Sequence, residues 1–150
     1  MFAGIDLGAN TGFAVLDKDG SRQASLTWRL GVRSGSSLLT FHDNLDFALI
    51  NHGITMVGYE QIRQAHKSRV AACAYGAYEG ILMLVCARLK LPLYGFFPYE
   101  IKRAATGFVE ADKEDMEAMV FRRWGYLVDT HDEADAIFVA ELTRLRANGQ

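Results

Sequence analysis

The hydrophobic and polar positions of the chain predict a run of β-strands, followed by alternating helices and strands. Apolar stretches within residues 2–17 flank a turn rich in Gly, Asn and Thr, a pattern typical of a β-hairpin. The turn signal Asp17–Gly20 leads to a third strand over residues 23–29, which would complete an antiparallel meander. Two shorter strands are predicted over residues 55–59 and 93–97.

Apolar residues at helical spacing separate these strands. The predicted helices cover residues 34–53, 70–89, 99–105, 112–124 and 130–145. In the long second helix Ala72, Gly76 and Gly80 are spaced by four, so we expect another element to pack closely there. The last helix opens with a capping-box signature, Thr130 to Glu133. This order predicts an α/β fold with a five-stranded mixed sheet, helices on both faces, and two later strands parallel to the first.

Composition adds limits on size and location. At 150 residues, half of them hydrophobic and 23% charged, the chain is expected to form one domain over residues 1–150. Its apolar runs predict no membrane-spanning segment, and its start predicts no secretory signal. Cys73 and Cys86 would lie roughly 20 Å apart on one helix, so we expect free thiols in a reducing, cytoplasmic compartment. A net charge of −2 leaves nucleic-acid binding to local basic patches.

Asp6 is the first residue that points to chemistry. It ends the first predicted strand, where an alternating pattern would carry an apolar side chain, and an ionised carboxylate is costly to bury without a partner or a cation. Glu60 also follows a strand directly, and the carboxyl ends of neighbouring parallel strands meet at the edge where ligands bind. Asp132 and Asp135 are three residues apart at the start of the last helix, so they share a face near its positive end.

Four carboxylates at one sheet edge would repel each other, because no Lys or Arg is adjacent to them in the sequence. Hard divalent cations relieve such repulsion, and Mg²⁺ takes a few carboxylates together with water and phosphate oxygens. Two ions about 4 Å apart would then support phosphodiester hydrolysis. On spacing alone, a second interpretation stays equally open: helix capping for Asp132 and Asp135, and a solvated loop position for Glu60.

Four blocks of the sequence resemble the RuvC family of Holliday-junction resolvases, within the RNase H-like superfamily. The blocks are Gly4-Ile5-Asp6-x-Gly8 with Thr11-Gly12, then Tyr59-Glu60-Gln61 followed by Gly76-x-x-x-Gly80, then Lys102 through Thr106-Gly107 to Ala111-x-Lys113-x-x-Met116, and finally Asp132-Glu133-Ala134-Asp135-Ala136. They stand in the family's order and at similar spacing over nearly the whole chain.

The resemblance implies an RNase H-like fold and a metal-dependent endonuclease that nicks two strands of a four-way DNA junction, usually as a homodimer. The catalytic and metal-binding residues that it implies are Asp6, Glu60, Asp132 and Asp135. They would hold two Mg²⁺ (or Mn²⁺) ions, with Asp6 shared between them. An in-line attack by water would leave 5′-phosphate and 3′-hydroxyl ends.

Basic residues would have to gather around the acidic edge to bind DNA. The candidates for this DNA-binding face are Arg63, Lys67, Arg69, Lys102 and Lys113. Lys102 and Lys113 match the family's basic segment and are implied as phosphate contacts, with a solvated surface charge as the plain alternative. Because few cations would serve an acidic protein, we expect modest affinity that falls steeply with salt.

Two positions depart from the family's pattern. Leu7 stands where the family usually has proline, which should change the turn little. Family members often carry an aromatic wedge just after the second acidic motif, where this chain has Ile62 as its only apolar candidate. Phage-encoded relatives are often less strict about branched substrates, and this short basic loop is compatible with such a member.

Other interpretations stay open. YqgF-like proteins also resemble RuvC and would act on structured RNA, and a junction-binding module without catalysis is a non-enzyme alternative that the intact acidic positions disfavour. The pattern Asp6-x-Gly8-x-x-x-Gly12 also opens actin-like ATPases, which need a second such motif that this chain lacks. His131 is either a proton shuttle or metal ligand, or an exposed residue. Four aromatic residues are expected to pack rather than stack on bases: Tyr75, Tyr78, Trp124 and Tyr126.

Overall fold

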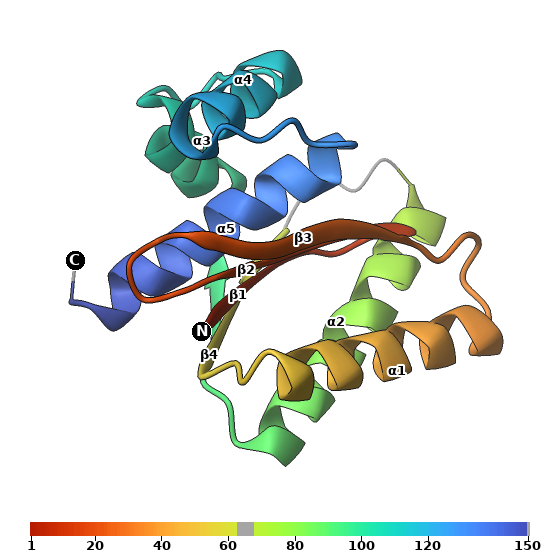
Figure 1. Cartoon of the computed structure of the whole chain (residues 1–150). Coiled ribbons are helices and arrows are strands. Elements are labelled where there is room, and N and C mark those ends of the chain that lie inside the picture. The colour runs from red at the N-terminus through yellow and green to blue at the C-terminus, as the bar shows by residue number, and fades with distance from the viewer. Residues whose placement is uncertain (63–67, 150) are drawn as a thin grey trace.

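The strands form one mixed sheet in the computed structural model, which describes residues 1–62 and 68–149 (Figure 1). The sheet order is β3-β2-β1-β4-β5, with β1 Phe2–Asp6, β2 Asn10–Leu16, β3 Arg22–Arg29, β4 Met56–Glu60 and β5 Leu93–Phe96. The strands β1, β2 and β3 pair antiparallel, whereas β4 and β5 run parallel to β1. The predicted meander and parallel crossovers are confirmed, with strand ends shifted by one residue.

Helices cover both faces of the sheet (Figure 1). They are α1 Gly35–Asn51, α2 Arg69–Leu89, α3 Pro98–Thr106, α4 Lys113–Trp124 and α5 His131–Ala147. The predicted caps Ser34 and Asp112 accept hydrogen bonds from the backbone of the first turns of α1 and α4, and Gly107 and Gly125 end α3 and α4 with left-handed backbone. The RNase H-like arrangement predicted from the sequence is confirmed.

Alternation along β1 assigns its side chains to the two faces. Ala3 and Ile5 belong to the core that α1 and α2 cover, whereas Gly4 and Asp6 face α5. The second core lies between the sheet and α3, α4 and α5, and contains Ala14, Ile137 and Phe138 among others. Asp6 is therefore placed on the face that receives the last helix.

Glycines on that face let α5 lie directly on the sheet. A Cβ at Gly4 would come 2.1 Å from the Ala136 carbonyl oxygen, and one at Gly58 would come 2.0 Å from Thr143 Oγ1. By contrast, a Cβ at Gly76 or Gly80 of α2 would meet nothing within 4 Å. The prediction of close packing at these α2 glycines is therefore wrong within the described part of the chain.

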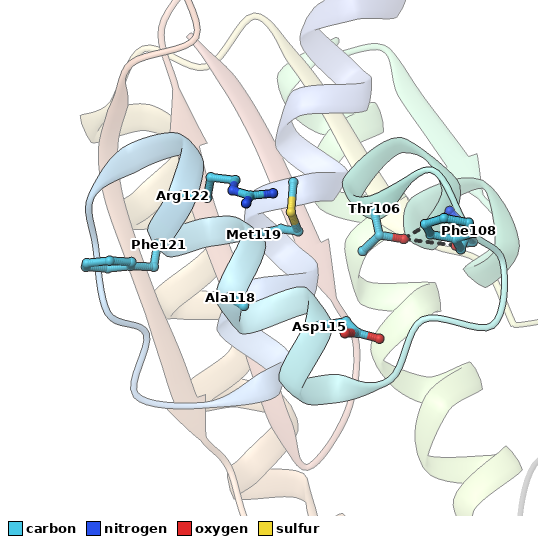
Figure 2. A pocket seen from close by; sticks show the side chains of 7 residues that line it. All are labelled: Thr106, Phe108, Asp115, Ala118, Met119, Phe121 and Arg122. Atoms are coloured by element: carbon cyan, nitrogen blue, oxygen red, sulfur yellow. Dashed lines mark hydrogen bonds between the residues drawn. The ribbon is translucent and has the colours of Figure 1, made fainter.

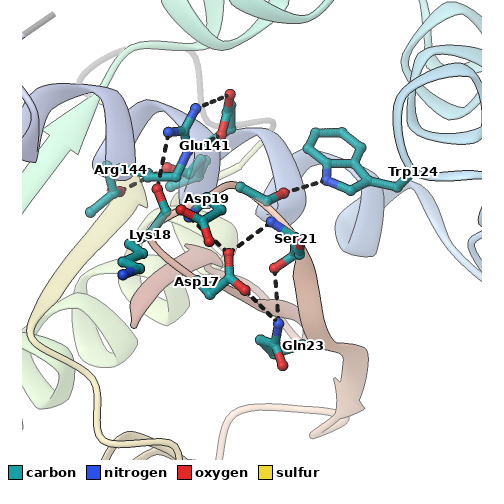
Figure 3. Close-up of polar contacts among 11 residues, drawn as sticks. Asp17, Lys18, Asp19, Ser21, Gln23, Trp124, Glu141 and Arg144 are labelled. Atoms are coloured by element: carbon teal, nitrogen blue, oxygen red, sulfur yellow. Dashed lines mark hydrogen bonds and ion pairs between the residues drawn. The ribbon is translucent and has the colours of Figure 1, made fainter.

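The turn between β2 and β3 holds the far end of α5 (Figure 3). Asp17 Oδ1 accepts hydrogen bonds from the backbone N–H of Asp19 and Ser21, both at 2.9 Å. Arg144 binds Glu141 through two nitrogens at 2.7 and 2.8 Å and donates to the Lys18 carbonyl. The indole N–H of Trp124 donates to the Gly20 carbonyl at 2.8 Å. These contacts join α4 and α5 to the turn farthest from the acidic edge.

The helix α2 is long and apolar enough to cross a bilayer, by length and composition only. Tyr78, Leu82 and Val85 bury one side of it in the core against the sheet and α1, while Met83 and Leu84 are exposed. The prediction that the chain has no membrane-spanning segment therefore depends on this packing and not on the composition of the helix. Cys73 and Cys86, both on α2, are free as predicted.

Candidate active site

Asp6 and Glu60 end the two central parallel strands. The register pairs Gly4 with Gly58 and Ile5 with Tyr59, so the two acidic residues come next along neighbouring strands. Asp6 is only 8% exposed. A hydrogen bond joins the side chains of Asp6 and Glu60; it raises the pKa of Asp6 and opposes the rise in the pKa of Glu60. The sheet thus brings together two carboxylates that are 54 positions apart in the sequence.

The first turns of α5 bring the other two carboxylates to this edge. The Asp132 backbone lies against Gly12, which is the register partner of Asp6 on β2. The charges of Glu60, Asp135 and Asp132 all act on Asp6 and raise its pKa. The convergence of the four acidic residues that the sequence singled out is therefore present in the structure.

Burial is the main cause of the raised pKa values at this edge. It raises the pKa of Asp6 well above the ordinary value, and repulsion by neighbouring carboxylates adds to this effect. The pKa of Asp135 is raised to about 7, first by burial and then by the charges of Glu60 and Asp132. Burial likewise raises the pKa of Glu60 and of Asp132. The four carboxyl groups at this edge would therefore carry more negative charge, when ionised, than the neighbouring positive charges compensate.

Two of the predicted DNA-binding lysines lie beside the acidic edge. The charge of Lys102 on α3 lowers the pKa of Glu60 and Asp135, and that of Lys113 on α4 lowers the pKa of Asp132. Arg69 is exposed at the first residue of α2. Arg63 and Lys67 lie outside the described residues. The structure thus gathers Lys102 and Lys113 with the carboxylates.

His131 and the four aromatic residues have structural contacts. His131 Nδ1 pairs with Glu117 on α4, while its charge also lowers the pKa of Asp132 and Asp135. Tyr75 and Tyr78 are buried, as predicted. Trp124 binds the β2–β3 turn, and the hydroxyl of Tyr126 donates to a buried carboxylate at 3.0 Å. Packing explains these aromatic residues.

That buried carboxylate is Glu133, which the sequence predicts to be part of a capping box and of the last family block. It is 1% exposed, and its Oε1 accepts from Ser25 Oγ at 2.5 Å and from Tyr126. Its Oε2 accepts from the Asp129 backbone N–H at 2.9 Å, not from that of Thr130. The Thr130 side chain does cap α5, so half of the predicted capping box is present. The apolar neighbours Ala134 and Ile137 gave a signal that this side of the helix is buried.

The carboxylate cluster fits a hard divalent cation by its chemistry. All four side chains supply oxygen ligands, and their excess negative charge is what such an ion would compensate. Within the described ranges, no three acidic, histidine or cysteine side chains are already arranged to hold a metal ion. The carboxylates would therefore have to close around an ion when it binds.

A groove of about 580 Å³ lies elsewhere, between α3 and α4 (Figure 2). Its lining residues are Thr106, Phe108, Asp115, Ala118, Met119, Phe121 and Arg122. It contains one carboxylate and one guanidinium, on different turns of α4, and is mostly apolar. This composition does not support phosphodiester hydrolysis, so the acidic edge remains the candidate active site.

Comparisons with known proteins identify the family of this chain. The family model described as crossover junction endodeoxyribonuclease RuvC matches residues 2–143. A RuvC of Wolinella succinogenes is 32% identical over 145 residues, which cover 91% of this chain and 89% of the relative. A RuvC of Thermosipho melanesiensis is 28% identical over 146 residues, covering 91% and 92%.

The fold is also that of a solved structure. The solved structure of Thermus thermophilus RuvC in complex with a Holliday junction substrate matches with a TM-score of 0.78 at 19% identity, over 97% of this chain and 94% of that chain. A five-stranded mixed sheet in the order β3-β2-β1-β4-β5 with helices on both faces is the fold of the RNase H-like class. The chain belongs to the RuvC family of crossover junction endodeoxyribonucleases. This family consists of structure-selective, metal-dependent endodeoxyribonucleases, so the enzyme class predicted from the sequence is confirmed.

Proposed function

We propose that this protein resolves four-way DNA junctions and related branched DNA, with Asp6, Glu60, Asp132 and Asp135 as its catalytic residues. The observation that supports this most directly is the convergence of these carboxylates from β1, β4 and α5 at one sheet edge. Carboxyl groups whose pKa values are raised by burial and by one another's charge are costly to ionise in the free protein. Such groups are expected where cations bind. The proposed domain spans residues 1–150.

The carboxylates would hold two Mg²⁺ (or Mn²⁺) ions in each active site. Asp6 is the proposed shared ligand, because the charges of Glu60, Asp135 and Asp132 all act on its carboxyl group. Such ions supply activation of a water molecule and stabilisation of the leaving oxygen, giving 5′-phosphate and 3′-hydroxyl ends. The side chains themselves must be ionised to ligate, and the raised pKa of Asp6 opposes this in the free protein.

Lys102 and Lys113 would bind and orient the DNA backbone. Each places a cation next to a proposed catalytic carboxylate, Lys102 beside Glu60 and Lys113 beside Asp132. Phosphate contacts fix position without reading sequence. These lysines would therefore hold the scissile phosphate against a cluster that would otherwise repel it, while Arg63, Lys67 and Arg69 complete the DNA-binding face.

Paired nicking of a junction requires two active sites, and a homodimer would supply them. The outward side of α2 carries exposed Val70, Met83 and Leu84, an apolar surface that a second copy could cover. The relatives cited above are bacterial, and we propose a cytoplasmic location where DNA and free thiols are both found. Light scattering tests the dimer: a monomeric mass at assay concentrations would contradict paired nicking.

Cleavage of labelled substrates tests the function. We expect the purified protein to cut a synthetic four-way junction in Mg²⁺ but not in EDTA, and to cut linear duplex DNA much more slowly. Asp6→Asn should reduce the rate at least 100-fold, whereas Asp43→Asn on α1 should not change it. Equal rates for Asp6→Asn and the unmodified protein would overturn the site. Preferential cleavage of structured RNA would overturn the substrate.

A further inference from the structure

A second groove, of about 490 Å³, opens directly beside the acidic edge, between the end of β4 and the first turn of α3. It is lined by Gln61, Ile62, Phe97, Pro98, Tyr99 and Lys102. We propose that this groove receives one unstacked nucleobase of the bound DNA, with Tyr99 as the residue on which the base stacks. This inference rests on the nuclease function proposed above for the neighbouring carboxylates.

One wall of the groove is fixed to the strand that carries Glu60. The backbone N–H of Gln61 donates to the Phe96 carbonyl at 2.8 Å, which continues the pairing of β4 with β5. The hydroxyl of Tyr75 donates to the Glu60 carbonyl at 2.8 Å and accepts from the Ile62 N–H at 3.1 Å. This wall is therefore held in place by the same elements that position the catalytic carboxylate.

The opposite wall is a pair of aromatic rings. Phe97 and Tyr99 stack with their centroids 5.7 Å apart and their planes 10° apart. Glu100 fixes the start of α3, because its carboxylate accepts from the Phe97 N–H at 2.7 Å. The Tyr99 side chain is nevertheless 55% exposed. A flat aromatic surface, held in place and open to solvent, is the surface on which single-stranded nucleic acids stack.

Charge and position favour a nucleotide over a peptide as the occupant. Lys102 stands at the rim, and its charge also acts on Glu60 and Asp135. A nucleotide combines a flat, largely apolar base with an anionic phosphate, and the groove combines flat rings with an ammonium group. The amide of Gln61 adds a donor and an acceptor that could meet the edge of a base. An apolar peptide would use the rings but would gain nothing from the adjoining catalytic edge.

The base must be unpaired to enter, because stacked and paired bases expose no ring face. When the arms of a four-way junction are unstacked, the base pairs at the crossover lack a stacking neighbour on one side, so they open at a lower cost than pairs inside an arm. The groove would thus favour substrates with an open base next to the scissile phosphate. Tyr99 would act on substrate choice and affinity without touching the reacting atoms.

Binding measurements in EDTA test the groove with the full-length protein. The probes are a four-way junction carrying 2-aminopurine at nucleotides flanking the cleavage position, and a single-stranded oligonucleotide of about twelve thymidines, a length within the range of known single-strand sites. The variants are Tyr99→Ala, Tyr99→Phe, which keeps the ring, and Phe108→Ala, which removes an exposed aromatic side chain outside this groove. Thermal unfolding checks that each variant is folded.

We expect Tyr99→Ala to weaken binding of both probes about tenfold and to change the 2-aminopurine fluorescence. Tyr99→Phe and Phe108→Ala should stay within twofold of the unmodified protein. If the protein cleaves junctions in Mg²⁺ but Tyr99→Ala binds both probes normally, the groove does not receive a nucleobase and the proposed function stands. If the protein does not cleave junctions, the proposed function falls. In that case, a tenfold loss of affinity of Tyr99→Ala for the single-stranded probe would still support nucleobase binding in the groove. Equal affinity of the variant and the unmodified protein would overturn it.

Discussion

Gly12 lies directly beneath the backbone of Asp132: a Cβ added to the glycine would come 1.8 Å from the Asp132 carbonyl oxygen. Gly12 is also the register partner of Asp6 on the neighbouring strand. The distance between α5 and the sheet at the active site is therefore set by the absence of a side chain on β2. The glycine of the first sequence block thus has a packing role in the acidic cluster.

Replacing Gly12 with alanine should push the start of α5 away from the sheet. Because the obstacle is backbone and cannot rotate aside, we expect a loss of about 2 kcal/mol or more in the free energy of unfolding. For a chain of this size each kcal/mol corresponds to about 2–4 °C in melting temperature. Junction cleavage should fall further than the folded fraction does, since Asp132 and Asp135 move.

The matched control is Gly80→Ala, at an α2 position where an added Cβ meets nothing. It should raise stability by up to about 1 kcal/mol through helix propensity alone. Thermal unfolding and cleavage assays on both variants separate the two effects. A Gly12→Ala protein with unchanged melting temperature and activity would show that α5 is not held in the way described.

The elements of this fold were predictable because each has a strong local signal. The caps at Ser34 and Asp112 and the alternation in β1 specified helix starts and strand faces from neighbouring residues alone. What local patterns could not give is contact between distant segments. The glycines of α2 were expected to pack closely and do not, whereas Gly12 and Gly58 do. Only the path of α5 across the sheet distinguishes these two groups.

In the candidate site, too, local features were predictable from the sequence and contacts between distant segments were not. The four carboxylates were recognisable from their type and their positions at element ends, and the two lysines from the resemblance to the RuvC family. The structure brings these residues together. Glu133 could not be assigned, because its donors Ser25, Tyr126 and Asp129 come from β3 and the loop before α5. The apolar neighbours Ala134 and Ile137 indicate that this side of the helix is buried, but the donors that bind Glu133 depend on tertiary contacts that no short pattern contains.

Glu133→Gln should weaken the anchoring of α5 to β3. The amide keeps the shape of the side chain but replaces one accepting oxygen with a donor, so that one of the groups now bonded to Glu133 loses its partner. We expect a loss of about 1–3 kcal/mol in the free energy of unfolding. Chemical denaturation measures it, with exposed Glu110→Gln as the control. Because the helix carries Asp132 and Asp135, a higher Mg²⁺ requirement for cleavage should accompany the loss.

Stability in EDTA should depend on pH through the acidic cluster. The pKa of Asp135 is about 7 in the folded protein, against 3.8 in the unfolded chain. Between these values the folded state retains a proton that the unfolded state has released. The contribution of Asp135 to stability is therefore greatest below about pH 4 and is lost as the pH rises from there to about 7. The raised pKa of Asp6 acts in the same direction.

Thermal unfolding in EDTA between pH 5 and about 8 measures this effect. Asp135→Asn should flatten the pH dependence and be more stable than the unmodified protein at the alkaline end, whereas Asp43→Asn should keep it. Added Mg²⁺ should restore stability most at high pH, because protons and cations compete for the same oxygens. A melting temperature that rises steadily with pH in EDTA would contradict the arrangement of charges described above.

Lys102 and Lys113 should contribute to DNA binding mainly through charge. If each contacts one phosphate, its replacement by alanine lowers the slope of log affinity against log salt by about 1 and weakens binding to junctions of any sequence alike. Lys18→Ala is the control, because Lys18 lies in the β2–β3 turn at the opposite end of the sheet. Titrations at several salt concentrations measure the slopes. A full slope retained in both variants would mean that the DNA passes the acidic edge on another side, and that Arg69 and its neighbours carry the contacts instead.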